Sequence, residues 1–170
     1  FYPKSPKSYV LRNDPNGFTD VTLDVLPKQE LGMVSDALWT DFDNDGWFDL
    51  IVVGEFMDIT FLKNNKGKFQ DVTNNTGLKY TSGWWNSVVS GDFDADGDMD
   101  YLVGNFGLNS DFKCSPEQPL TIYTKDFDGN GTIDPLISCF RGGEEHLIHT
   151  RDILVDQISS MKGKFKDNDS

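Results

Sequence analysis

An internal repeat of 51 residues is the feature of this sequence that most restricts its fold. Residues 13–62 align with residues 64–113 without a gap, and the two segments share 15 identities in 50 positions. The identities include a Phe-x-Asp-Val-Thr segment that begins at Phe18 and again at Phe69. Self-similarity at a spacing of tens of residues is typical of solenoids, propellers and other repeat arrays.

The content of each repeat predicts short β-strands. Runs rich in β-branched, aromatic and other apolar residues, bounded by Gly, Asn or Asp, indicate strands. In the two repeats such runs cover residues 18–22, 35–40, 48–54, 58–62, 69–73, 86–91 and 99–104. Four short strands in about 50 residues fit one blade of a β-propeller, whereas the coils of a β-helix are far shorter.

A third, altered unit follows at residues 120–149. Strands are predicted at 120–125 and 133–140, with a hairpin turn at 141–144 and a return strand at 145–148. The Phe-x-Asp-Val-Thr segment is missing before this unit. We therefore expect a mainly β fold, a partial β-propeller of about three blades within residues 1–150.

The last segment, residues 151–170, differs in kind. Apolar residues recur at four-residue spacing from Ile153 to Phe165, with Gln157 as a polar exception, which predicts one amphipathic α-helix over about 151–165 and then a polar tail. We expect this helix to pack against its own domain or further chain, although a partner-binding helix is the alternative. The chain lacks an initiator Met and is short for the four or more blades of a closed propeller, so we expect a fragment of a longer protein.

Three nine-residue segments share the pattern D-x-D-x-[DN]-G-x-x-D: residues 41–49, 92–100 and 126–134. Side-chain oxygens at positions 1, 3, 5 and 9, with a main-chain carbonyl at position 7, can surround one hard cation. Gly at position 6 permits the sharp turn. Calcium accepts six to eight oxygens in variable geometry, so such a loop suits it better than magnesium.

Chance predicts only about 0.03 matches to this pattern in a chain of this composition. The alternative is three acidic turns without metal, but it leaves 12 crowded carboxylates with unrelieved repulsion. An EF-hand would need Glu at position 12, where this chain has Val52, Val103 and Ile137. The third loop is the weakest site, because Asn130 leaves it three charged ligands against four in the first.

Composition agrees with an acidic, loop-rich protein. Of the 28 acidic residues 23 are Asp, and the formal net charge is −13. Asp favours turns and hard-cation loops, whereas Glu is the better helix former. This balance argues against nucleic acid and anionic membrane surfaces as partners. No apolar run of 18 residues occurs, so no membrane-spanning segment is predicted.

Together these residues resemble the FG-GAP/VCBS repeat family, whose blades build the β-propeller of the integrin α-subunit. The Phe-x-Asp-Val-Thr segments and the run Val103-Gly104-Asn105-Phe106-Gly107 are similar to a subgroup that includes cartilage acidic protein and the bacterial UnbV/ASPIC proteins. The resemblance covers about residues 13–140. It implies up to three calcium ions, with carbonyl ligands from Trp47, Asp98 and Thr132 and side-chain ligands from Asp41, Asp43, Asp45, Asp49, Asp92, Asp94, Asp96, Asp100, Asp126, Asp128, Asn130 and Asp134.

The resemblance also implies a secreted, periplasmic or cell-surface location. We expect a segment that binds structural calcium and serves extracellular recognition or adhesion, with a protein or glycan partner. Further blades or another chain would cover its open sheet edges. No catalytic residue and no other cofactor are predicted. The alternative is a non-catalytic scaffold or accessory part of a glycan- or lipid-active hydrolase.

Two residue pairs have less specific interpretations. His146 and His149 form an H-x-x-H spacing that could hold zinc or transfer protons, but we expect ordinary structural roles because nothing supplies a third ligand. Cys114 and Cys139 allow one disulfide or two free thiols, and we favour free thiols without excluding the bridge.

Aromatic residues form a second group. Trp39, Trp47, Trp84 and Trp85 could stack on a sugar, but we expect them to pack within or between sheets. Phe occupies position 2 of all three loops, at residues 42, 93 and 127. We interpret this shared residue as an anchor of the loop in the core.

Overall fold

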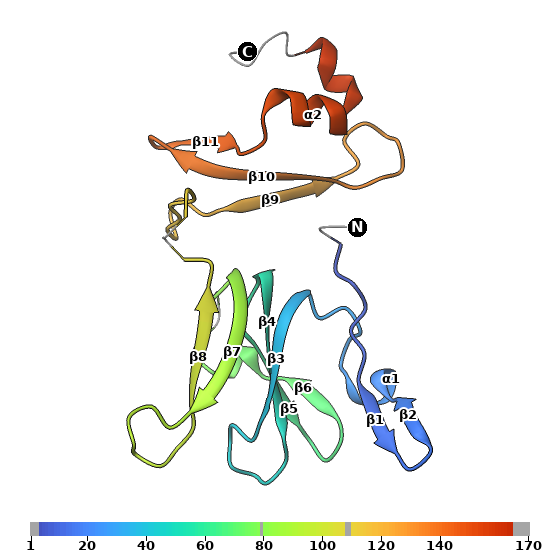
Figure 1. Ribbon diagram of the computed structural model, residues 1–170, viewed down its shortest axis with the longest axis vertical. Helices are drawn as coiled ribbons and strands as arrows, with labels where there is room; N and C mark the ends of the chain where they lie inside the picture. Colours follow the sequence, from blue (N-terminus) through green and yellow to red (C-terminus); the bar gives the residue numbers. More distant parts are fainter. Residues whose placement is uncertain (1–3, 79, 108–109, 165–170) are drawn as a thin grey trace. The chain divides into compact units, whose positions relative to one another are not determined.

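The structure is a computed structural model that describes residues 4–78, 80–107 and 110–164 (Figure 1). The described part of the chain is mainly β, as predicted, and its strands form three antiparallel sheets. The chain divides into two compact units. The first spans Lys4–Gly107, and the second contains the described residues 110–164.

The first unit carries both full repeats. Its elements are β1 (Leu11–Asp14), β2 (Gly17–Asp20), α1 (Thr22–Val25), β3 (Met33–Thr40), β4 (Asp49–Met57), β5 (Thr60–Asn64), β6 (Phe69–Asp71), the 3₁₀ turn η1 (Thr73–Asn75), β7 (Gly83–Gly91) and β8 (Asp100–Asn105). Strands β1, β2, β3 and β4 precede β5, β6, β7 and β8 by about one 51-residue repeat. The sequence repeat is therefore a repeat of structure.

Strands β3, β4, β5 and β6 form an antiparallel meander, which is the four-strand unit that the repeat predicts. The C-terminal end of β4 also pairs with the start of β7, and β8 continues that sheet. The hairpin of β1 and β2 is separate from it. Each sequence repeat thus contains a two-stranded hairpin, β1–β2 or β5–β6, which we call the outer hairpin. It is followed by the first two strands of the next sheet, β3–β4 or β7–β8.

Strand β4 is the centre of the first unit, because it is buried on both faces. Leu50 and Val52 face one apolar cluster, to which Leu26 of the β2–β3 segment also contributes. Ile51 and Val53 face the opposite cluster, which includes Val88 of β7. A strand covered on both sides reads as a continuous apolar run, as this one does. It provides a rigid end point for the loop that precedes it.

The second unit contains the altered third repeat. Its elements are β9 (Thr121–Lys125), β10 (Asp134–Arg141), β11 (Glu144–Leu147), α2 (Arg151–Gln157) and the 3₁₀ segment η2 (Ser159–Gly163). The predicted hairpin turn is present, and Gly142 and Gly143 both adopt positive φ (61° and 89°). Cys139 on β10 is buried and Cys114 is exposed, and both are free thiols.

The C-terminal helix is shorter than the predicted segment 151–165. Helix α2 ends at Gln157, and Ile158 leaves helical geometry with φ −123° and ψ 85°. Ile158 is only 1% exposed, whereas Ile153 is 52% exposed, so burial selects a different face from the one that the spacing indicated. Residue 165 and the predicted polar tail lie outside the described residues. None of the helices in the described ranges has the length and apolar character required to span a membrane.

Candidate metal centre

Each aspartate loop joins two antiparallel strands that pair with each other. The loops connect β3 to β4, β7 to β8, and β9 to β10. In all three, the Asp at position 9 pairs with the residue just before position 1, in the pairs Thr40–Asp49, Gly91–Asp100 and Lys125–Asp134. The strand register therefore closes the three loops at the same point.

The Asp at position 1 organises the backbone of each loop. Asp41 accepts hydrogen bonds from the main-chain N–H groups of Asp45 (3.0 Å) and Gly46 (2.9 Å). Asp92 and Asp126 accept the equivalent bonds at 2.8–3.1 Å. In the third loop, the bond from Gly131 N–H is the main cause of the lowered pKa of Asp126. This shared scheme directs the other side chains of each loop to similar places.

Two positions in each loop adopt left-handed backbone geometry. Position 4 has φ of 59°, 62° and 76°, and position 6, which is always Gly, has φ of 86°, 97° and 88°. Such φ values cost little for Gly and more for other residues. The Gly at position 6 therefore has the conformational role that the sequence motif assigns to it.

The Asp at position 9 is buried in the first and third loops and half-buried in the second. One of its oxygens accepts the main-chain N–H of position 2 at 3.2, 2.9 and 2.9 Å in the three loops. Asp49 also accepts the N–H of Asn64 on β5 at 2.7 Å and is fully buried. Burial raises the pKa of Asp49, because it disfavours the charged form. Asp134 is 2% exposed, so it is similarly enclosed.

Carboxylates gather within each loop. In the first and second loops the acidic ligand atoms at positions 1, 3 and 5 lie within 4.8 Å of one another, and in the third those at positions 1, 3 and 9 do. In the second loop a hydrogen bond with Asp96, together with its negative charge, raises the pKa of Asp98. Oxygen donors crowded this closely repel one another and favour a hard cation.

Position 5 sets the orientation of position 7. The side-chain oxygens of Asp45, Asp96 and Asn130 accept the main-chain N–H groups of position 7 at 3.0, 3.1 and 2.7 Å. Asn130 accepts the same bond as the two Asp residues, so its amide preserves the local fold of the third loop. The carbonyl role of Trp47, Asp98 and Thr132 remains a prediction.

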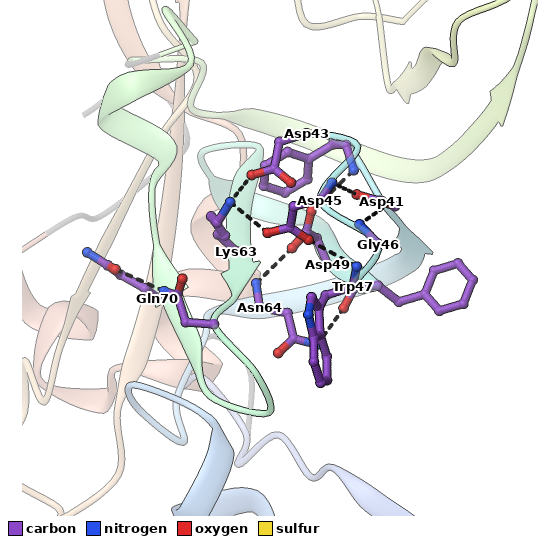
Figure 2. Close-up of polar contacts among 12 residues, drawn as sticks. Asp41, Asp43, Asp45, Gly46, Trp47, Asp49, Lys63, Asn64 and Gln70 are labelled. Atoms are coloured by element: carbon purple, nitrogen blue, oxygen red, sulfur yellow. Dashed lines mark hydrogen bonds and ion pairs between the residues drawn. The ribbon is translucent and has the colours of Figure 1, made fainter.

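Sequence analysis missed two residues of β5 that contact the first loop. Figure 2 shows the Lys63 ammonium between Asp43 and Asp45, with an Nζ–Oδ2 distance of 2.9 Å to Asp45 and a close ion pair to Asp43. These contacts raise the pKa of Lys63 and lower that of Asp45. The neighbouring Asn64 donates its side-chain amide to Phe48 O (2.8 Å). The repeat offered a sign of this basic residue, because Arg12 occupies the position that corresponds to Lys63 one repeat earlier.

The histidines form no cluster with a third metal-ligating side chain in the described ranges. His146 lies 3.9 Å from the exposed Glu144, and a side-chain nitrogen of His149 (Nε2) is buried with no described hydrogen-bond partner.

Some aromatic residues pack against one another as predicted, whereas Trp39 and Trp47 are 52% and 44% exposed, so the expected packing is incomplete for these two. Trp84 stacks on Phe106, with ring centroids 5.0 Å apart, and Trp85 donates its indole N–H to Thr81 O at 2.9 Å. Phe42 packs on Phe61, as the core-anchor interpretation predicts. That interpretation was wrong for the other two loops, because Phe93 is 61% exposed and Phe127 is 39% exposed.

A comparison with protein families supports the resemblance of the central region. The family model described as FG-GAP-like repeat matches residues 41–103, which include the first two aspartate loops, strands β4 to β7 and the first part of β8. This match confirms an FG-GAP repeat in that part of the chain. No curated protein and no solved structure gives a match.

Proposed function

We propose that this chain is a calcium-binding segment of a β-propeller that serves recognition or adhesion outside the cytoplasm. The observation that carries the proposal is the common construction of the three loops. Each has the same strand register, the same main-chain hydrogen bonds accepted by the Asp at position 1, and a cluster of carboxylates. One construction repeated three times in an FG-GAP setting is difficult to attribute to unrelated acidic turns.

Calcium fits these loops better than a transition metal does. The donors at positions 1, 3, 5, 7 and 9 are all oxygens, whereas zinc and copper favour sites with imidazole or thiolate ligands. In the first loop the proposed ligands are Asp41, Asp43, Asp45, the Trp47 carbonyl and Asp49, and the other loops use the corresponding residues. A bound cation would neutralise the cluster and tie together the ends of two strands, which is a structural role.

Packing in the first unit supports a propeller. The sheet of β3 to β6 is covered on one face by residues of the segment that precedes β3, including Leu26 and Leu31, and on the other by residues of β7 and β8. On β7 and β8 the pair Val88–Val103 faces this cluster, whereas the paired Val89 and Leu102 are 49% and 62% exposed. We infer that a further blade or another chain covers this outer face.

We propose that the segment is not catalytic. Among the described residues, the two carboxyls whose pKa is raised, Asp49 and Asp98, both belong to the loops, where the fold and the proposed metal account for them. The extracytoplasmic location and the protein or glycan partner rest on the family resemblance. A non-catalytic scaffold within a hydrolase uses the same loops, and a full-length sequence with a hydrolase domain would favour it.

Isothermal titration of the chain with calcium tests the metal proposal. We expect about three ions per chain and weak or absent heat with magnesium. The control is a variant with Asp43→Ala, Asp94→Ala and Asp128→Ala, which removes position 3 from every loop. Calcium heat that is absent in the parent chain, or unchanged in the triple variant, would overturn the proposal.

A further inference from the structure

We propose that Lys63 is a tethered counter-ion of the first aspartate loop, which stabilises residues 41–49 without calcium and lowers their affinity for calcium. The inference rests on the proposed calcium function and extends it to how the three sites differ. Lys63 belongs to β5, outside the nine-residue motif.

The contacts place the ammonium group on two proposed ligands. Lys63 Nζ forms ion pairs with Asp43 and Asp45, at positions 3 and 5, and its side chain is 28% exposed (Figure 2). Strand β5 holds it there, because the adjacent Asn64 donates its N–H to the buried Asp49. The Lys63 ammonium group already lies beside these carboxylates. It would therefore repel a divalent cation that enters the loop.

Within the described ranges, neither of the other two loops has this arrangement. No described Lys or Arg forms an ion pair with residues 92–100 or 126–134. One repeat after Lys63 the chain has Cys114, which is exposed and lies in none of the described strands. The second loop also carries five carboxylates, one more than the first. We therefore expect the second loop to bind calcium more tightly than the first.

The repeat supports a specific role for a basic residue here. Arg12 on β1 occupies the position one repeat before Lys63, and the following residues, Asn13 and Asn64, are identical. Both basic residues lie on the first strand of an outer hairpin, but Arg12 pairs with Asp14 of its own strand, whereas Lys63 pairs with Asp43 of an aspartate loop. The repeat thus places a basic residue at this position twice, and the contact with an aspartate loop is described only for Lys63.

The test uses terbium(III) as a luminescent substitute for calcium. Trp47 lies within the first loop, and neither of the other two loops contains a Trp. Energy transfer from Trp47 therefore reports occupancy of the first loop, and Trp47→Phe identifies the part of the signal that belongs to it. We would compare Lys63→Gln with the parent chain in terbium titrations with calcium competition, and in thermal melts with chelator.

Lys63→Gln should raise the affinity of the first loop about tenfold, which corresponds to the loss of two modest exposed ion pairs. In chelator it should lower the melting temperature, because the loop keeps its negative charges and loses their counter-ion. Lys63→Arg should behave like the parent chain. The matched control is Lys68→Gln, which makes the same charge change at an exposed residue without a described ion pair.

Two negative outcomes are distinguishable. If the first loop binds terbium with the same affinity in the parent chain and in Lys63→Gln, the role of Lys63 is refuted while calcium binding stands. If neither protein binds terbium or calcium at any loop, the proposed function is refuted. The proposed effect of Lys63 on metal affinity is then refuted as well. An equal effect of Lys68→Gln would also overturn the inference, because it would show a general charge effect.

Discussion

Aspartates of one motif have different physical roles in this protein. Asp49 is fully buried and accepts main-chain hydrogen bonds from Phe42 and Asn64, so it is part of the fold. The side chain of Asp43 lies on the surface of the first loop and forms an ion pair with Lys63. We therefore expect position 9 to contribute to stability even without metal, and position 3 to contribute mainly through the proposed calcium ion.

Substitutions at these two positions should separate the roles. In chelator, Asp49→Ala should lower the free energy of unfolding by about 2–4 kcal/mol, because it leaves two N–H groups without their acceptor. Asp43→Ala should cost about 1 kcal/mol or less in chelator. With calcium, Asp43→Ala should weaken one site and leave the other two intact. Urea unfolding and calorimetric titration measure these effects, and loss of all binding in Asp43→Ala would contradict separate sites.

The three loops differ at position 4, although their backbone is the same. Asn44, Ala95 and Gly129 all adopt positive φ there, and Ala is the least suited of the three to that region. The second loop is thus held in a backbone conformation that its own residue disfavours. We infer that the hydrogen bonds that Asp92 and Asp94 accept from the main-chain N–H groups of Asp96 and Gly97 maintain it.

Ala95→Gly should relieve this strain. The gain in free energy of unfolding should be about 1 kcal/mol or less, because Gly also increases the entropy of the unfolded chain. The reverse substitution in the third loop, Gly129→Ala, should destabilise the chain by a similar amount. Urea melts of both variants in chelator test this pair, and a destabilising Ala95→Gly would show that the conformation carries no strain.

The sheet of β9, β10 and β11 contains a polar contact that depends on pH. Glu145 on β11 accepts hydrogen bonds from Ser138 (2.5 Å) and Tyr123 (2.9 Å), and these bonds lower its pKa. A carboxyl with a lowered folded-state pKa stabilises the fold above its ordinary pKa, and this contribution is lost as pH falls through the lowered value. The sheet should therefore weaken on acidification.

Glu145→Gln tests this contribution. The variant should show a smaller loss of melting temperature than the parent chain between about pH 5 and pH 3, because its amide does not titrate in that range. Thermal melts at several pH values in chelator provide the measurement. Parallel curves for the two proteins would mean that the hydrogen bonds of Glu145 do not contribute to stability.

For the whole molecule, calcium should act as a stabilising ligand. A site with free calcium at 100 times its dissociation constant adds about 2.7 kcal/mol, if the unfolded chain does not bind the ion. In a chain of this size that corresponds to a rise of about 5–10 °C in melting temperature. Melts with calcium and with chelator should differ accordingly, whereas superimposable curves would refute structural calcium. The triple position-3 variant should lose the difference.

The repeat and the loop motif allowed much of the fold to be predicted. The 51-residue offset predicted the recurrence of strands, and the predicted strands lay on either side of each aspartate loop; the structure shows that these flanking strands pair with each other. These features depend on residues a few positions apart, so the sequence contains their physical cause. The end of α2 was not predictable in this way, because Ile158 is positioned by burial rather than by helical spacing.

The sequence by itself determined the acidic loops, because the hydrogen bonds that shape each one join residues two to seven positions apart. The tertiary structure decided that Lys63 of β5 meets the first loop, since that contact depends on how β4 pairs with β5. It also decided that Phe42 is packed and Phe93 exposed, because β4 is covered on both faces whereas the outer face of β7 and β8 carries exposed Val89 and Leu102. Local spacing specifies a turn, but only the assembled sheets specify what surrounds it.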